Sequence, residues 1–272
     1  GGVAHALNNI LAPVAGYTDL FLMDMDENNK LTDRIRRIGK SAQEAADVIQ
    51  DLLTLARRGR YELISCDLNR IIHDFMESPT FINLTEQKPN IKITVNLDDS
   101  IAAINGSPPH LLKLIMNLTV NAFDAIEDDG EVFIATSCRD VTVLSNGYAL
   151  GNAAGAYVQL SVADTGKGIP PEALEKIFEP YFSKKKMGNS SGSGLGLSVV
   201  YGVIKDHDGY YDIISSPDNG TVFKVFLPIL VDEKKTTTKE DTEITGSETV
   251  LVVDDNEAQR DVAAELIGSL GY

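Results

Sequence analysis

The sequence is poor in cysteine and in positive charge, and it has no long apolar run. Its two cysteines, Cys66 and Cys138, are far apart and lack metal-ligand spacing, so we expect buried or half-buried thiols of a reducing compartment. The 40 acidic residues outnumber the 24 basic ones, and the formal charge of −16 disfavours nucleic acid and anionic membranes as partners. No segment reaches the roughly 18 apolar residues of a membrane span, so we expect no membrane insertion and a cytoplasmic location.

The chain begins with two stretches in which apolar residues alternate spacings of three and four. The first contains Val3, Leu7, Ile10, Val14, Tyr17 and Phe21, and the second contains Leu31, Ile35, Ile38, Ala42, Ala45, Ile49, Leu52 and Ala56. Polar residues 24–30 separate them, which predicts an antiparallel helical hairpin over residues 1–58. One hairpin cannot cover its own apolar seam, so pairing of two copies in a four-helix bundle, and hence a homodimer, is predicted.

Residues 59–230 have a mixed pattern that predicts an α+β sandwich with helices on one face of a sheet. Asp67 is placed to cap a helix that runs to Met76, and a strongly apolar helix is expected from Pro108 through Ile126. Strands are expected at 91–97, 131–137, 157–163, 210–215 and 221–227. The sequence therefore predicts two folded parts, a helical hairpin and this sandwich.

The C-terminal 42 residues are too few for a further complete domain. Residues 231–248 are polar and lack periodicity, which predicts a linker. Residues 249–272 begin with a buried-type strand that ends in Asp254-Asp255 and continues into a helical stretch. This segment is predicted to be the truncated start of another domain.

Four segments within residues 59–230 carry residue types suited to binding a nucleotide. Asn117 and Asn121 share one helix face and can present amide oxygens to a hydrated cation. Asp164 follows a strand and can accept a hydrogen bond from an adenine amino group, while Gly166 and Gly168 let the backbone come close to the purine. Either segment alone has an ordinary explanation, as helix-surface amides or as a turn.

The other two segments are an aromatic hinge and a glycine-rich loop. The hinge, residues 177–186, leads into Lys184 and Lys185, and the loop contains Gly192, Gly194, Leu195 and Gly196. The loop runs into a helix whose N-terminal amides suit phosphates. A glycine-rich loop is weak evidence alone, but the joint occurrence of all four segments favours a nucleotide site.

In this order the four segments resemble the N, G1, F and G2 boxes of the histidine-kinase ATPase domain, whose Bergerat-type fold is shared with gyrase-type ATPases. The resemblance implies ATP as the nucleotide, adenine recognition by Asp164, and Mg²⁺ coordination by Asn121 with support from Asn117. It also implies phosphate contacts from the Gly192–Gly196 loop and a mobile lid between Pro180 and Gly192. In that lid Lys185 would meet the γ-phosphate, with Lys184 beside it.

His5 lies roughly opposite the Val3–Phe21 seam on a helical wheel, so we expect it to face solvent. Residues 1–11 are similar to the phosphoacceptor box of the same family, which implies that His5 is the nucleophile. The family usually has a carboxylate directly after this histidine, where this chain has Ala6. Loss of a general base commonly costs ~10²–10⁴-fold in rate, so either autophosphorylation is slow or Ala6 is an engineered residue, and the sequence leaves both open. Asn9 matches the position from which bifunctional members orient a water for phosphatase action.

The resemblance covers residues 1–229 as a kinase core and residues 249–272 as the first strand and helix of a response-regulator receiver. It implies a homodimer, a receiver domain as partner, and an upstream sensor domain that is absent from these residues. Two alternatives stay open. A gyrase-type ATPase is disfavoured because the 110–121 helix has no Glu to activate water, and a catalytically impaired nucleotide-binding scaffold is kept open by Ala6. His73, His110 and His207 fit no motif and are expected at the surface or at helix ends.

Overall fold

The computed structural model describes residues 2–25, 29, 31–56, 62–141, 154–182, 194–230, 250–251 and 267–268. The chain divides into two units, Gly1–Leu230 and Val231–Tyr272. The predicted linker lies outside the described residues, and so does nearly all of the predicted receiver fragment. Those two predictions therefore stay predictions. None of the described helices is long and apolar enough to cross a membrane.

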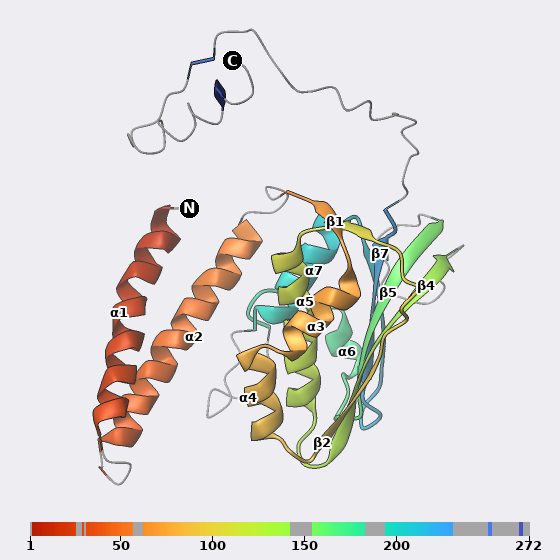
Figure 1. Cartoon of the computed structure of the whole chain (residues 1–272). Helices are drawn as coiled ribbons and strands as arrows, with labels where there is room; N and C mark the ends of the chain where they lie inside the picture. The colour runs from red at the N-terminus through yellow and green to blue at the C-terminus, as the bar shows by residue number, and fades with distance from the viewer. Residues whose placement is uncertain are drawn as a thin grey trace. The chain divides into compact units, whose positions relative to one another are not determined.

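The predicted hairpin is present as α1 (Gly2–Asp24) and α2 (Thr32–Ala56), which run in opposite directions (Figure 1). The two helices approach closely where Gly39 of α2 faces Thr18 of α1, since a Cβ at Gly39 would lie 2.6 Å from the Thr18 hydroxyl oxygen. Much of the α1 seam stays uncovered in a single chain: Ile10 and Tyr17 are each 63% exposed. Such a stripe is expected of a helix that packs against a second copy.

The predicted sandwich follows, with a five-stranded sheet in the order β2-β4-β5-β7-β6. Its strands are β2 (Ile91–Asn96), β4 (Gly130–Val141), β5 (Gly155–Asp164), β6 (Tyr210–Ser215) and β7 (Thr221–Pro228). Strand β2 pairs parallel to β4, and the other pairs are antiparallel. A separate ribbon pairs β1 (Ile64–Cys66) with β3 (Ile104–Gly106). All five predicted strands are confirmed.

Helices cover one face of this sheet, as predicted (Figure 1). They are α3 (Leu68–Met76), α4 (Pro79–Gln87), α5 (Pro108–Ala125), the single turn α6 (Pro171–Leu174) and α7 (Gly196–Asp206). Asp67 caps α3 as expected, because its Oδ1 accepts from the backbone N–H of Asn69 at 2.8 Å. Such a cap stabilises a helix by about 1 kcal/mol.

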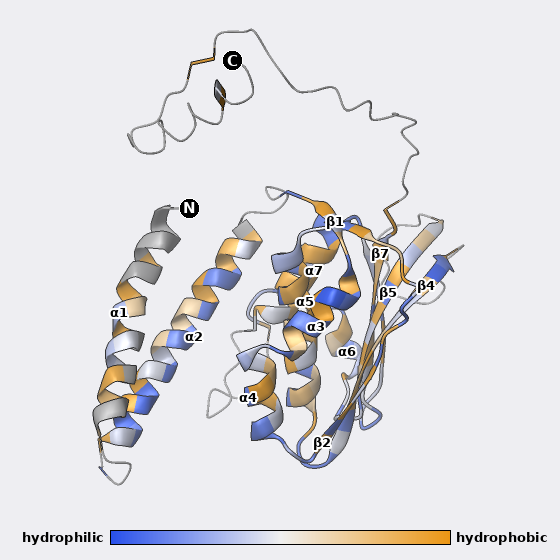
Figure 2. Cartoon of the chain, viewed as in Figure 1, coloured by the Kyte–Doolittle hydropathy of each residue, from blue (hydrophilic) through white to orange (hydrophobic). Residues whose placement is uncertain are grey.

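The hydrophobic core lies between α3, α5, α7 and the inner face of the sheet. Figure 2 shows apolar residues concentrated on α5 and α7 and along the central strands. Fully buried members include Leu114 and Ile115 of α5, Val199 and Val203 of α7, and Leu160 and Val225 of the sheet. The alternation of buried and partly exposed residues along β5 and β7 follows from their period of two.

Several features differ from the sequence-based expectations, among them the unpredicted β1–β3 ribbon. Helix α4 was not predicted, although Ser78 followed by Pro79 is a helix-start pattern and the Ser78 hydroxyl accepts from Phe81 N–H at 3.3 Å. The expectation that both thiols are at least half-buried was wrong for Cys138, which is exposed near the end of β4 beside exposed Arg139. His207 is at a helix end, as expected, but it is buried.

His207 ends α7 and connects it to the start of α5. His207 is buried, with only 3% of the residue exposed. The backbone N–H of Ser107 donates to Nε2 at 2.9 Å, so Nε2 is unprotonated and Nδ1 carries the hydrogen that it donates to the Val203 carbonyl at 2.7 Å. Burial lowers the pKa of His207, an effect that the Val203 carbonyl and the charges of Asp206 and Asp208 oppose. The folded state therefore favours the neutral imidazole.

We predict that stability falls as the pH is lowered from about 7.5 to 5.5, because the unfolded chain takes up a proton at the ordinary histidine pKa whereas the lowered pKa of His207 makes the folded chain take it up only at lower pH. The free energy of unfolding should decrease with falling pH in the natural chain and decrease less in His207→Gln. Urea unfolding followed by circular dichroism at fixed protein concentration measures both slopes. Equal slopes in the natural chain and in His207→Gln would show that His207 does not contribute to the loss of stability at low pH.

Candidate nucleotide-binding site

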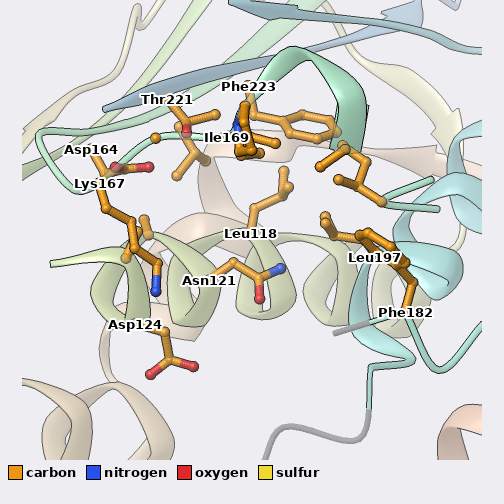
Figure 3. Close-up of a pocket in the computed structure, with 17 residues that line it drawn as sticks. Leu118, Asn121, Asp124, Asp164, Lys167, Ile169, Phe182, Leu197, Thr221 and Phe223 are labelled. Carbon is orange, nitrogen blue, oxygen red and sulfur yellow. The ribbon is translucent and has the colours of Figure 1, made fainter. Parts of the chain in front are cut away.

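One pocket lies between α5, α6, the start of α7 and the adjoining ends of β5 and β7, and it encloses about 220 Å³. Figure 3 shows Asp164 and Lys167 at one end and Phe182 and Leu197 at the other, with Leu118 and Asn121 of α5 between them. The lining residues are Leu118, Asn121, Ala122, Asp124, Ala125, Val162, Asp164, Lys167, Gly168, Ile169, Pro170, Ala173, Ile177, Phe182, Leu197, Thr221 and Phe223. A mostly apolar pocket with a few polar groups at its ends suits an aromatic base carrying polar substituents.

Asp164 is the polar group at the end of β5, where the antiparallel register places it opposite Thr221 of β7. Its Oδ1 accepts from the backbone N–H of Gly166 at 2.8 Å. Burial raises the pKa of Asp164, and hydrogen bonds from the backbone of Gly166 and Thr221 oppose that rise. A carboxylate has room for several hydrogen bonds, so Asp164 keeps acceptor capacity that faces the pocket.

Gly166 and Gly168 are required by close approaches of the chain to itself. A Cβ at Gly166 would lie 2.4 Å from the Ala125 carbonyl oxygen at the end of α5. Gly168 has a φ of 65°, and a Cβ there would lie 2.0 Å from the Ser216 carbonyl oxygen. Gly168 lines the pocket, whereas Gly166 packs behind it. The glycines thus hold the 164–168 loop against α5 and the β6–β7 turn.

The two asparagines of α5 have different environments. Asn121 lines the pocket, and its Nδ2 is buried without a hydrogen-bond partner among the described residues. Asn117 does not line the pocket, and its Nδ2 donates to the Gly196 carbonyl at 3.3 Å. A buried amide that lacks a partner is costly unless a ligand or water satisfies it. Asn121 is therefore the asparagine placed to meet a ligand, and Asn117 holds the first residue of α7.

Helix α7 begins beside the pocket. Gly196 is its first residue, and no side chain caps its N-terminus by a hydrogen bond. Gly194 has a φ of 68° and its carbonyl accepts from the Tyr181 N–H at 3.0 Å, which joins the ends of the predicted hinge and loop segments. The Leu195 side chain is fully buried, so only its backbone is available to a ligand. Uncapped N–H groups at a helix start suit an anion.

Several predicted site residues lie outside the described part of the chain. They are Lys184, Lys185 and Gly192, together with most of the predicted lid. His5, Ala6 and Asn9 lie within α1, but the structure describes no side chain at these positions. Among the described residues, no group of three or more His, Cys, Asp or Glu side chains forms a metal site. Any cation here would need ligands from a nucleotide or from water.

Sequence reasoning missed several residues of the pocket. Lys167 lies inside the Asp164–Gly168 segment but was given no role, and Asp124 follows Asn121 by three residues, a spacing that places both on one helix face. Thr221 lies in the pocket because the β5–β7 register places it opposite Asp164, and the local sequence does not reveal this pairing. The apolar lining residues Ile169, Phe182, Leu197 and Phe223 come from four separate segments. Only the tertiary structure brings them together.

Both folded parts of the chain match known protein families. Residues 106–231 match the model for the histidine kinase-, DNA gyrase B- and HSP90-like ATPase, and residues 1–60 match the His Kinase A phosphoacceptor domain. Sensor kinase CckA of Brucella abortus (strain 2308) is 32% identical over 100% of this chain and 29% of its own length. Sensor histidine kinase ZraS of Escherichia coli (strain K12) is 28% identical over 86% of this chain and 45% of its own length. The chain thus spans less than half of these relatives.

Solved structures support the same fold. Full-length ShkA in complex with AMPPNP superposes with a TM-score of 0.60 and 21% identity, covering 99% of this chain and 53% of that chain. The Acinetobacter baumannii histidine kinase AdeS gives a TM-score of 0.53 and 15% identity over 81% of this chain and 95% of that chain. At these identities the likeness concerns the fold alone.

The second folded part is therefore an ATP-binding domain of the class shared by histidine kinases, gyrase B and HSP90, which confirms the predicted Bergerat-type fold. The combination of this domain with the phosphoacceptor hairpin that precedes it identifies the family. This chain belongs to the sensor histidine kinases.

We predict that Asp164→Asn weakens ATP binding by roughly 10- to 150-fold, the equivalent of ~1.5–3 kcal/mol for a hydrogen bond to a charged group. The asparagine can keep the Gly166 hydrogen bond through its carbonyl oxygen, so the fold should persist. Its NH₂ group offers a hydrogen where the adenine amino group needs an acceptor. Calorimetric titration with ATP, with circular dichroism as the check on folding, measures the effect. Unchanged affinity in a folded variant would refute the assignment.

Proposed function

We propose that this chain is the catalytic core of an ATP-dependent protein-histidine kinase that phosphorylates its own His5. The observation that carries the proposal is the pocket that joins Asp164, Asn121 and the start of α7 in a domain that follows a phosphoacceptor hairpin. In the reaction the bond between the γ-phosphorus of ATP and its bridging oxygen breaks, and a bond from that phosphorus to His5 Nε2 forms. ADP leaves, and a receiver aspartate would take the phosphoryl group.

The pocket supports a definite orientation of ATP. Adenine fits among Leu118, Ile169 and Val162 with its amino group toward Asp164. The triphosphate then extends toward the uncapped start of α7, where N–H groups of the Gly192–Gly196 loop would be the donors to the phosphates. Lys184 and Lys185 would add positive charge to the phosphates from the lid segment, with Lys185 at the γ-phosphate. This local positive charge offsets the repulsion that a chain of formal charge −16 exerts on an anion.

Asn121 is the residue that fits Mg²⁺. Its side-chain amide is buried in the pocket with an unpartnered nitrogen, and a half-turn of the amide exchanges its oxygen for that nitrogen. Magnesium in nucleotide sites is held by one or two protein oxygens together with phosphates and waters, which matches the absence of a larger acidic cluster among the described residues. When bound, the ion would neutralise charge on the phosphates. Asn117 would support the site by fixing Gly196.

We further propose the larger setting of this core. It would work as a homodimer in the cytoplasm, with a sensor domain upstream and a receiver that begins at residue 249. Asn9, one turn beyond His5, would orient a water for dephosphorylation of the receiver. The exposed apolar stripe of α1 supports the dimer. The acidic pair Asp254-Asp255, by its resemblance to the Mg²⁺ site of a receiver, supports the hybrid arrangement.

Neither alternative function has support from a specific observation. A gyrase-type ATPase needs a carboxylate to activate water, and α5 has no Glu from residue 110 to 121. The case for a nucleotide-binding scaffold without kinase activity would depend on Ala6 alone. Incubation with γ-labelled ATP separates the three possibilities, since a kinase gives acid-labile label on protein, an ATPase gives free phosphate, and a scaffold gives neither.

We predict that Asn121→Ala weakens ATP binding more in the presence of Mg²⁺ than in its absence. The substitution removes the amide oxygen proposed to hold the ion, whereas contacts to adenine do not depend on it. Isothermal titration with ATP, once with Mg²⁺ and once with a chelator, gives the two affinity ratios. Asp164→Asn is the matched comparison, because its loss should be similar in both conditions. Equal losses for Asn121→Ala would exclude Asn121 from coordination of the metal.

We predict that labelling from γ-labelled ATP requires His5 and increases in Ala6→Asp by about tenfold or more, toward the ~10²–10⁴-fold typical of a general base. The new carboxylate would accept the Nδ1 proton and stabilise positive charge that develops on the ring during transfer. Because this gain arises in the transition state, ATP affinity should stay nearly constant. Initial rates of acid-labile label and calorimetric affinities test both parts.

His5→Ala in each background is the control for this experiment. Label that persists without His5 would overturn His5 as the acceptor. An unchanged rate in Ala6→Asp would refute only the explanation that transfer is slow because the carboxylate is missing. It would leave His5 as the proposed acceptor.

A further inference from the structure

The C-terminal turn of α5 is bonded to a lysine from a different part of the chain. Lys88 follows α4 as its C-cap, and its Nζ donates to the carbonyl oxygens of Phe123 at 2.6 Å and Ile126 at 2.7 Å. The last carbonyls of a helix lack the usual partner four residues on, and the Phe123 carbonyl also accepts from the C-cap N–H of Ile126 at 3.3 Å. The negative end of the helix dipole favours a cation there. Helix α5 has no basic residue in its own last turn. Lys88 supplies that cation from 35 residues away.

The same turn forms part of the nucleotide pocket. Asn121, Asp124 and Ala125 all line it. On the side toward the 164–168 loop, the Ala125 carbonyl accepts from the Lys167 N–H at 3.0 Å. A Cβ at Gly166 would lie 2.4 Å from that carbonyl oxygen, so the loop tolerates little displacement of the turn. The end of α5 is thus bonded to Lys88 by two carbonyls and to the nucleotide loop by a third.

We propose that Lys88 is a positioning residue for the nucleotide site, an inference that rests on the proposed binding of ATP in this pocket. Lys88 does not line the pocket and acts through α5. Its two charge-assisted hydrogen bonds fix the last turn of the helix, and the turn in turn fixes Asn121 and the loop that carries Asp164. Without them the turn frays, since helix ends lack internal partners, and the groups that meet adenine and the metal lose their mutual spacing.

The test compares Lys88→Met, which keeps the length of the side chain but removes its donors, with Lys88→Arg, which keeps charge and donors. Lys92→Met is the matched control, because it removes the same charge four residues further on, from a side chain that is 68% exposed and pairs with Glu131 at 3.1 Å. In the 272-residue chain at a temperature where every variant is folded, Lys88→Met should weaken ATP binding about tenfold. Lys88→Arg should recover most of that affinity, and Lys92→Met should match the natural chain.

Two further measurements distinguish positioning from a general loss of stability. Amide hydrogen exchange at Lys167, whose N–H bonds to Ala125, should accelerate in Lys88→Met, while exchange at Val203 in the middle of α7 should not. The KM for ATP should rise more than kcat falls. A folded Lys88→Met that binds ATP as the natural chain does would overturn the inference, even if its melting temperature fell. Should Lys88→Met not fold, Lys88→Gln is measured by the same criteria.

The outcomes for the natural chain separate this inference from the proposed function. If the natural chain itself fails to bind ATP, the proposed function is refuted, and so is the inference about Lys88 that rests on it. If the natural chain binds ATP and Lys88→Met binds it equally well, only the role of Lys88 is refuted.

Discussion

The packing of α5 on the sheet decides where every polar residue of this helix points. Leu114, Leu118 and Ala122 recur at intervals of four and are buried against the strands. Burial of a large apolar side chain stabilises by about 1.5–3 kcal/mol, whereas a single neutral hydrogen bond such as that of Asn117 contributes about 1 kcal/mol. The apolar face therefore sets the rotation of the helix. Asn117 and Asn121 are left at its edge, one toward α7 and one in the pocket.

The sheet register completes the same site from the opposite side. Antiparallel pairing of β5 with β7 places Asp164 opposite Thr221, and a shift by one residue would turn Asp164 to the outer face. The turn between β6 and β7 then receives the 164–168 loop, where Lys167 accepts from Asp218 N–H at 2.9 Å through its carbonyl. The position of Asp164, the carboxylate proposed to bind adenine, is thus a consequence of strand pairing and of two close backbone approaches.

An acidic protein that binds an anion requires local electrostatics to outweigh the overall charge. At physiological ionic strength the screening length is about 8 Å, so most of the formal charge of −16 acts weakly at the pocket. Lys167 at one end of the pocket and the uncapped start of α7 lie much closer to a bound nucleotide. The proposed roles of Lys184 and Lys185 follow the same reasoning. Net charge disfavours nucleic acid as a partner without excluding a small phosphate ligand.

Periodicity and local motifs allowed the hairpin, α3, α5 and all five sheet strands to be predicted, because each depends on residues close in sequence. The ATP-binding class followed from four segments in one order, and two residues from these segments, Asp164 and Asn121, line one pocket in the structure. The roles expected for Leu195 at the phosphates and for Asn117 near the metal stay predictions: the structure buries the Leu195 side chain and bonds the Asn117 amide to the Gly196 carbonyl. Their local spacing carried no information on what α7 contacts.

The sequence by itself determined the helical and strand periods, the family and the residue types of the site. Only the tertiary structure decided which of those residues meet in the pocket, why Gly166 must be glycine, why His207 is buried, and that Lys88 holds the end of α5. Each of these depends on a contact between segments far apart in the chain, as with Ser107 and His207, 100 residues apart. Side-chain patterns within one segment report the period of that segment and its apolar face. They do not report which distant backbone groups will need a partner once the faces have packed.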